Sequence, residues 1–183
     1  MITRGMRAFG MSATDEYDPA VAKASALSAL LQLVGYAIWQ VAECEDVLAH
    51  WVVISLRPTQ GIGETAAAPI VEGVQRKTFG QLMAELRRAE VLDSELQARV
   101  DGLLAERNWL VHHSKRESRG VLHKPDQFDA LVDRLKQLAE EATEVGGVLG
   151  QRLEKFVVEA GVDPMLIEEE ATRLAREWGY DDV

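Results

Sequence analysis

The apolar residues of this chain recur at spacings of three and four residues almost throughout, which is the period of an α-helix. The first run follows Asp18-Pro19, an acidic N-cap with a proline at the first helical position. Its apolar positions are Val21, Ala24, Leu27, Leu31, Val34, Ile38, Val41, Leu48 and Trp51. We therefore predict one long helix there. A loop is expected from Pro58 to Arg76, where glycine and proline are frequent.

Two shorter helices are predicted next. Thr78-Phe79-Gly80-Gln81 has the pattern of a capping box, and the helix that it opens is expected to end near Glu90. Asp93 or Ser94 caps the following helix. We expect this helix to fray over residues 113–119.

The remainder of the chain predicts a long helix and a short one. Pro125 opens the long helix and Gly161 ends it, and Asp163-Pro164 opens an acidic helix that ends at Gly179. The pattern thus predicts an all-α fold, an up-and-down bundle of about five helices. We expect a flexible leader over 1–17 and a bundle over 18–160. Residues 161–183 are expected to form an acidic helix that packs on the bundle or extends it.

The composition is that of one globular domain. The chain has 183 residues, 47% of them hydrophobic and 27% charged, which is enough to bury a core. Cys44 is the single cysteine, so no intramolecular disulfide can form, and a cytoplasmic location is expected. The segment from Met1 to Tyr17 lacks the apolar core of a signal peptide.

One segment is long enough to span a membrane. Residues Ala24 to Ala42 carry no charge. Polar residues such as Gln32 and Gln40 dilute this segment, and acidic residues follow it at once. We therefore favour a helix buried in the bundle and expect no membrane partner.

The net charge of −10 argues against a general nucleic-acid binder, which usually has a basic surface. The charge is unevenly distributed, however. Residues 107–124 hold five basic residues against one acidic residue, a local balance of +4, whereas residues 160–183 hold seven acids against two arginines. Ordinary solvated charges explain this distribution as well as a binding surface does.

The basic stretch coincides with the candidate chemistry. Residues Arg107 to His112 read RNWLVH, at the end of a predicted helix. An arginine that stabilises charge on phosphorus and a histidine that moves a proton suffice to cleave RNA. At 100° per residue, Asn108 and His112 share a face about 40° apart, while Arg107 and His112 diverge by about 140°. Two copies of the helix would therefore complete one site, which favours a homodimer.

These residues resemble the signature of the HEPN family of helical bundles, an arginine and a histidine separated by four to six residues. Arg107 and His112 match it at the shortest spacing, with Asn108 at the favoured polar position, and His113 would satisfy the next spacing. The Thr78 to Leu82 entry into a helix is also similar to bacterial members. The resemblance covers roughly residues 19–160.

The resemblance implies an activity and partners. Family members are metal-independent endoribonucleases that dimerise through the motif helix, and many are toxins or anti-phage effectors. RNA, a second copy and an antitoxin protein are the implied partners. His112 would be the general base, Arg107 the charge-stabilising group and Asn108 an orienting residue. Residues that would bind RNA are His113, Lys115, Arg116 and Arg119. Members modified by a nucleotidyltransferase antitoxin often carry a tyrosine two residues after the histidine, and this chain has Ser114 there.

Two other interpretations remain open. Arg107 pairs with Glu106 or a core acid in a non-catalytic helical module that binds or regulates a partner. The acids and histidine around Cys44 (Glu43, Glu45, Asp46 and His50) suggest metal ligands, but their spacing favours a solvated helix face. Neither a metal nor a cofactor is expected.

Overall fold

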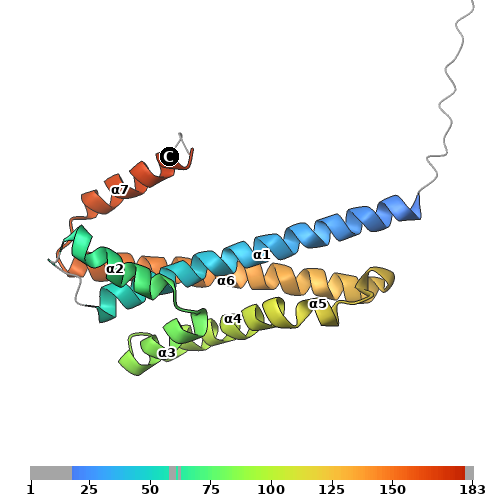
Figure 1. Ribbon diagram of the computed structural model, residues 1–183, viewed down its shortest axis with the longest axis horizontal. Coiled ribbons are helices and arrows are strands. Elements are labelled where there is room, and N and C mark those ends of the chain that lie inside the picture. Colours follow the sequence, from blue (N-terminus) through green and yellow to red (C-terminus); the bar gives the residue numbers. More distant parts are fainter. Residues whose placement is uncertain (1–17, 58–60, 62, 180–183) are drawn as a thin grey trace, which may run out of the picture.

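The fold is built on three long helices that lie side by side (Figure 1). The computed structural model describes residues 18–57, 61 and 63–179, and every regular element in these residues is helical. The long helices are α1 (Pro19–Leu56), α4 (Ser94–His112) and α6 (Pro125–Glu159). The predicted all-α class is confirmed, with seven α-helices in the described part rather than about five. The expected leader, residues 1–17, lies outside the described residues.

Helices α1 and α6 run in the same direction and form the most extensive contact of the bundle. Lys23 Nζ lies 3.0 Å from His123 Nε2, just before α6, and farther along both helices Trp51 Nε1 donates to the Leu149 carbonyl at 2.9 Å. α4 runs in the opposite direction to α1 and α6 and brings the chain back to the end of the bundle where α1 starts (Figure 1). Two short α-helices at the ends of this trio, α2 (Glu64–Gln75) and α5 (Ser114–Glu117), were not among the five expected helices.

The predicted loop from Pro58 to Arg76 is wrong over most of its length, because it contains α2 (Glu64–Gln75). Gly63, with φ 77°, precedes this helix, and Pro69 lies inside it. An internal proline removes a backbone hydrogen bond, so tertiary packing has to stabilise the helix. Val74 supplies such packing, with 2% of its surface exposed.

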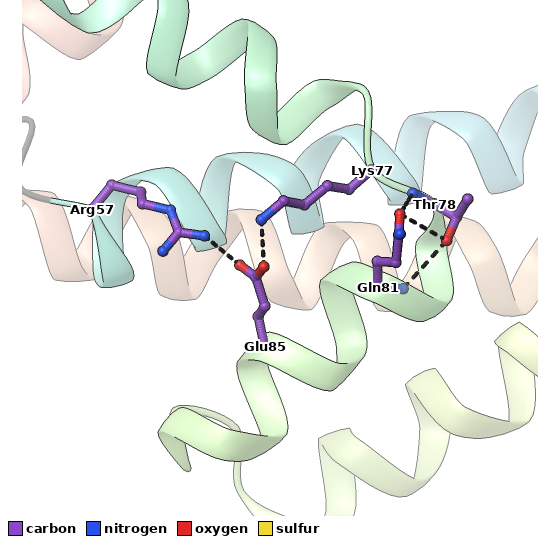
Figure 2. A network of polar contacts seen from close by, with 5 residues as sticks. All are labelled: Arg57, Lys77, Thr78, Gln81 and Glu85. Carbon is purple, nitrogen blue, oxygen red and sulfur yellow. Dashed lines mark hydrogen bonds and ion pairs between the residues drawn. The ribbon is translucent and has the colours of Figure 1, made fainter.

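Helix α3 (Phe79–Ala89) begins with the predicted capping box, shown in Figure 2. The Thr78 N–H donates to Gln81 Oε1 at 2.9 Å. One turn later, Glu85 accepts hydrogen bonds from Lys77 and from Arg57 Nη2, the latter at 2.6 Å. The Lys77 hydrogen bond, with the charge of Arg57, holds the pKa of the Glu85 carboxyl below its usual value. This network ties the end of α1 to α3.

Asp93 is the N-cap of α4, and its carboxylate accepts from the Leu96 N–H at 2.9 Å. The fraying expected over residues 113–119 is wrong. The chain instead forms α5 (Ser114–Glu117) and a 3-10 turn, η1 (Val121–His123). Between them Gly120 has φ 77°, a left-handed conformation that glycine adopts without strain. Val121 is buried and fixes this turn to the core.

The core lies where α1, α3, α4 and α6 face one another. Among the described residues, its largest fully buried side chains are Phe79, Leu48, Leu82, Met83, Leu86, Leu103, Leu135 and Leu149. α1 and α6 approach closely at Gly146, where a Cβ would lie 3.8 Å from the Cys44 Cα. Burial raises the pKa of the Cys44 thiol to about 12, and the charges of Glu45 and Glu141 add to the effect.

The first half of α1 is not buried as the sequence analysis expected. Leu31 is 61% exposed, Ile38 48% and Trp39 67%. This half packs on α4, α6 and η1 on one side, whereas α2 and α3 lie beside the second half (Figure 1). α1 is also long and apolar enough to cross a membrane: its most apolar window has a mean hydropathy of 1.5, and 6% of that window is buried.

Helix α7 (Pro164–Glu177) extends from the end of α6 and turns back at a wide angle to the bundle (Figure 1). Gly161, with φ 96°, ends the preceding segment as predicted. Asp163 caps α7 by accepting from the Met165 N–H at 3.0 Å. No residue of α7 is buried, and none belongs to the core.

Candidate functional site

The motif residues lie on the last two turns of α4. The helix is continuous to His112, so the divergence of about 140° between Arg107 and His112 holds on its surface. Asn108 and His112 share an exposed face, and Arg107 is half-buried on another side. A single chain therefore brings Asn108 and His112 together and keeps Arg107 apart from them.

Arg107 lies at a small hollow of about 100 Å³ between α4 and α1. Its Nη2 atom is 4.0 Å from Glu45 Oε2, and the two side chains are 28% and 23% exposed. Glu106 is not its partner, because both carboxylate oxygens of Glu106 accept from Arg134, at 2.8 and 3.0 Å. At 4.0 Å the contact with Glu45 is a weak ion pair, so the arginine keeps donors free for another group.

The same hollow is bordered by exposed apolar side chains. Ile38 on α1 is 48% exposed, and Val111 on α4 is 51% exposed. Buried arginine charge is costly unless it is paired, and exposed apolar surface favours a partner. The apolar flank formed by Ile38 and Val111 thus lies beside a cation that is only partly satisfied.

Trp109 fastens the motif helix to its neighbours. Its Nε1 atom donates to Glu117 Oε2 at 2.6 Å, and the Arg134 guanidinium lies 3.4 Å from its ring centroid. This stacked cation also binds Glu106, so α4, α5 and α6 are joined at one point. The indole is occupied by these contacts, which makes Trp109 a structural residue rather than a platform for a base.

The residues expected to bind RNA gather beyond the end of α4. Lys115 and Arg116 lie on α5, Arg119 follows it, and all three are exposed. Among the described residues, none of the three has an ion-pair partner. The His113 ring centroid is 6.4 Å from that of His112. A basic cluster therefore stands beside the proposed base.

A larger groove, of about 490 Å³, opens next to this cluster between the start of α1 and the α5–η1 segment. We call it the α1–η1 groove. Its walls are apolar, and its rim carries Lys23, Lys115 and His123. The wall residues include Leu27, Leu30, Leu31, Val34, Val121, Leu122, Leu131 and Leu135. Sequence reasoning missed the groove because Lys23 and His123 are 100 positions apart.

Within the part of the chain that the structure describes, no group of three or more histidine, cysteine, aspartate or glutamate residues is placed to hold a metal ion. Comparison with family models, with curated proteins and with solved structures finds no match to the chain. The chemistry therefore has to be inferred from α4 and its surroundings. These offer an imidazole that moves a proton, a guanidinium that stabilises negative charge, and a basic cluster suited to a polyanion.

Proposed function

We propose that the protein is a metal-independent endoribonuclease of the HEPN type that acts as a homodimer. The observation that carries the proposal is the position of Arg107. Its guanidinium is half-buried at an exposed apolar flank, while His112 faces elsewhere on the same helix. A catalytic arginine is useful only where a base and a substrate phosphate meet it. A second copy of α4 is the simplest source of that base.

Dimerisation across the apolar flank would bury exposed apolar side chains and would complete the catalytic site. It would cover Ile38 and Val111, which are about half exposed, and it would bring His112 of each copy toward Arg107 of the other. Such an interface is isologous, because the same surface is used by both copies. It creates two equivalent composite sites. The basic residues Lys115, Arg116 and Arg119 would hold the RNA backbone on either side.

The proposed reaction needs only groups of this chain. His112 takes the proton of a ribose 2′-hydroxyl, and the 2′-oxygen attacks the adjacent phosphorus. The bond to the 5′-oxygen breaks, and that oxygen leaves with a proton from solvent. Arg107 stabilises the extra charge on the phosphorane, a role worth a few kcal/mol in comparable sites. Asn108, on the same face as His112, orients the imidazole. The products carry a 2′,3′-cyclic phosphate and a 5′-hydroxyl.

The cellular setting proposed is that of a cytoplasmic toxin or anti-phage effector under the control of an antitoxin protein. Ser114 supports control by binding rather than by modification of that position, because its hydroxyl donates to the Leu110 carbonyl and is half-buried. A tyrosine that accepts a nucleotide would have to be exposed there. The antitoxin would therefore cover the motif surface.

One observation favours the alternative, a non-catalytic helical module. Glu45 lies within ion-pair distance of Arg107, as it would if the arginine were purely structural. The two interpretations assign different roles to Arg107. If the protein is an endoribonuclease, Arg107→Ala folds but no longer cleaves RNA. If it is a non-catalytic module, Arg107→Ala also folds, and there is no cleavage to lose.

The test is cleavage of structured RNA by the purified full chain in EDTA. We expect cleavage with cyclic-phosphate ends, and a loss of at least ~100-fold for Arg107→Ala and for His112→Ala. Arg176→Ala and His50→Ala are matched controls, since both are exposed residues outside the motif. Circular dichroism and light scattering establish that the variants fold and dimerise. Cleavage that requires magnesium or leaves a 3′-hydroxyl would refute the mechanism.

A further inference from the structure

Helix α7 is an amphipathic helix that packs extensively on no other element among the described residues. Ile167, Ala171, Leu174 and Trp178 recur at the spacing of one helix face, and Trp178 is 73% exposed. The helix has 14 residues, and isolated helices of about this length are marginal in water. The ion pairs of Arg173 within the helix add only a few tenths of a kcal/mol each. A stable α7 needs a surface to pack on.

The α1–η1 groove has the complementary properties. Its walls are apolar and its rim carries Lys23, Lys115 and His123, whereas the edge of the apolar stripe of α7 carries Glu168, about 100° from Ile167 on the helix surface. Glu168 forms no ion pair with a described residue. Docking an amphipathic helix into an apolar groove is a common mode of recognition, and opposite charges at the rim orient it.

α7 cannot reach the α1–η1 groove of its own chain. It lies at the start of α6, next to Leu131 and Leu135, whereas α7 follows the end of α6. The axial distance from Leu135 to Glu159 is about 36 Å, and α7 itself is only about 21 Å long. The connection is also short and folded, because the Val162 N–H donates to the Val157 carbonyl at 3.1 Å. Docking must therefore occur between two copies.

The proposed homodimer places the two parts together, and the inference rests on it. Ile38 is at the middle of α1, so a two-fold axis near it sets the two α1 helices antiparallel. At 1.5 Å per residue, the groove extends from about 6 Å to about 22 Å from Ile38 along α1, at Val34 and Lys23. α6 ends about 35 Å from Ile38 in the other direction, because Leu149 lies beside Trp51. α7 turns back from there toward the middle of the bundle (Figure 1), and its length of about 21 Å brings its end no nearer to Ile38 than about 14 Å. The C-terminal end of the partner's α7 and the groove thus reach the same stretch of α1.

We propose that α7 of each copy docks in the α1–η1 groove of the other copy and regulates access to the basic cluster. Leu174 and Trp178 fill the groove, and Glu168 at the edge of the stripe lies against Lys23, Lys115 and His123. Lys115 belongs to both the groove rim and the RNA-binding cluster, so an acidic helix seated there competes with the RNA backbone for the same cation. The released form of α7 is the form compatible with RNA.

The test follows hydrogen exchange of the α7 amides in the full chain, without RNA. At concentrations where the protein is dimeric, we expect these amides to be protected. Two variants reverse the charges, Lys23→Glu/His123→Glu in the groove and Glu168→Lys in the helix. Each alone should exchange about tenfold faster or more, whereas a mixture of the two should regain protection because both contacts then match again. Lys136→Glu and Glu154→Lys, at exposed positions on α6, are the matched controls.

A second variant separates this inference from the proposed function. Ile38→Asp disrupts the dimer face at an exposed position, so it should release α7 while the monomer stays folded. Protection of α7 that survives in this variant, or that is unchanged on dilution to monomer, would overturn docking between copies. So would rapid exchange in the wild-type dimer, or a charge-swapped mixture that remains unprotected. Because cleavage is not the readout, an inactive protein does not affect this result.

Discussion

A mixture of two inactive variants should recover activity if each site is shared between two copies. Arg107→Ala keeps His112, and His112→Ala keeps Arg107. In the heterodimer of these variants, one composite site has lost both residues and the other has kept both. The continuous α4 helix holds the two side chains about 140° apart, so no single chain completes a site. The variants alter one side chain each, and neither residue belongs to the core.

The magnitude follows from the symmetry. Random exchange of two variants at equal concentration gives half heterodimers, each with one intact site of two, so the mixture should reach about a quarter of wild-type activity. Each variant alone should stay at least ~100-fold below wild type. The assay is cleavage of a fluorescent RNA in EDTA after subunits have exchanged overnight. Activity that stays at the level of the single variants, while native mass spectrometry shows heterodimers, would refute a site shared between copies.

Three further predictions concern stability and reactivity. Glu85→Gln should destabilise the protein by about 1–2 kcal/mol at pH 7, measured by urea unfolding, because two partly buried cations lose their charged partner. The pKa of Glu85 is lowered on folding, so its contribution is present above the unfolded-state pKa and lost as the pH falls through the folded-state pKa. The difference between wild type and variant should therefore shrink below about pH 4.5, and a constant difference would contradict the ion pairing. Cys44 should resist thiol reagents at pH 8 until the protein is unfolded, since its pKa is raised to about 12; rapid labelling of the native protein would show that it is accessible. Gly146→Ala should be tolerated or stabilising by up to about 1 kcal/mol, whereas Gly146→Leu should cost about 1–3 kcal/mol against the α1 backbone, and equal melting temperatures would disprove that close approach.

The features that sequence predicted well are those set by neighbouring residues. Asp18, Thr78 and Asp93 cap helices by accepting hydrogen bonds from N–H groups two or three positions away. The local sequence is therefore enough to predict these helix starts. The angle between Arg107 and His112 is equally local. α2 was missed because Gly73, Pro69 and the glycines just before it obscured the period, and its packing against α1 joins residues far apart in the sequence.

The features that sequence could not supply depend on which segments meet. Glu45 lies 4.0 Å from Arg107 because α1 and α4 pack together, and the sequence of neither helix indicates that it packs on the other. The parallel arrangement of α1 and α6 likewise follows from the return of the chain through α4. The α1–η1 groove combines both effects, since Lys23 and His123 come from those two distant parts.

The pairing of α1 with α6 has a consequence for the synthesis of the protein. The two helices are separated by α2 to α5 in the chain, and a buried bond from Trp51 to the Leu149 carbonyl spans 98 positions. α1 is synthesised first, and its apolar side stays exposed until α6 has left the ribosome. At about 5–20 residues per second, this delay lasts several seconds or more, during which an aggregation-prone helix is uncovered. The nascent chain is therefore a natural client for chaperones until α6 is complete.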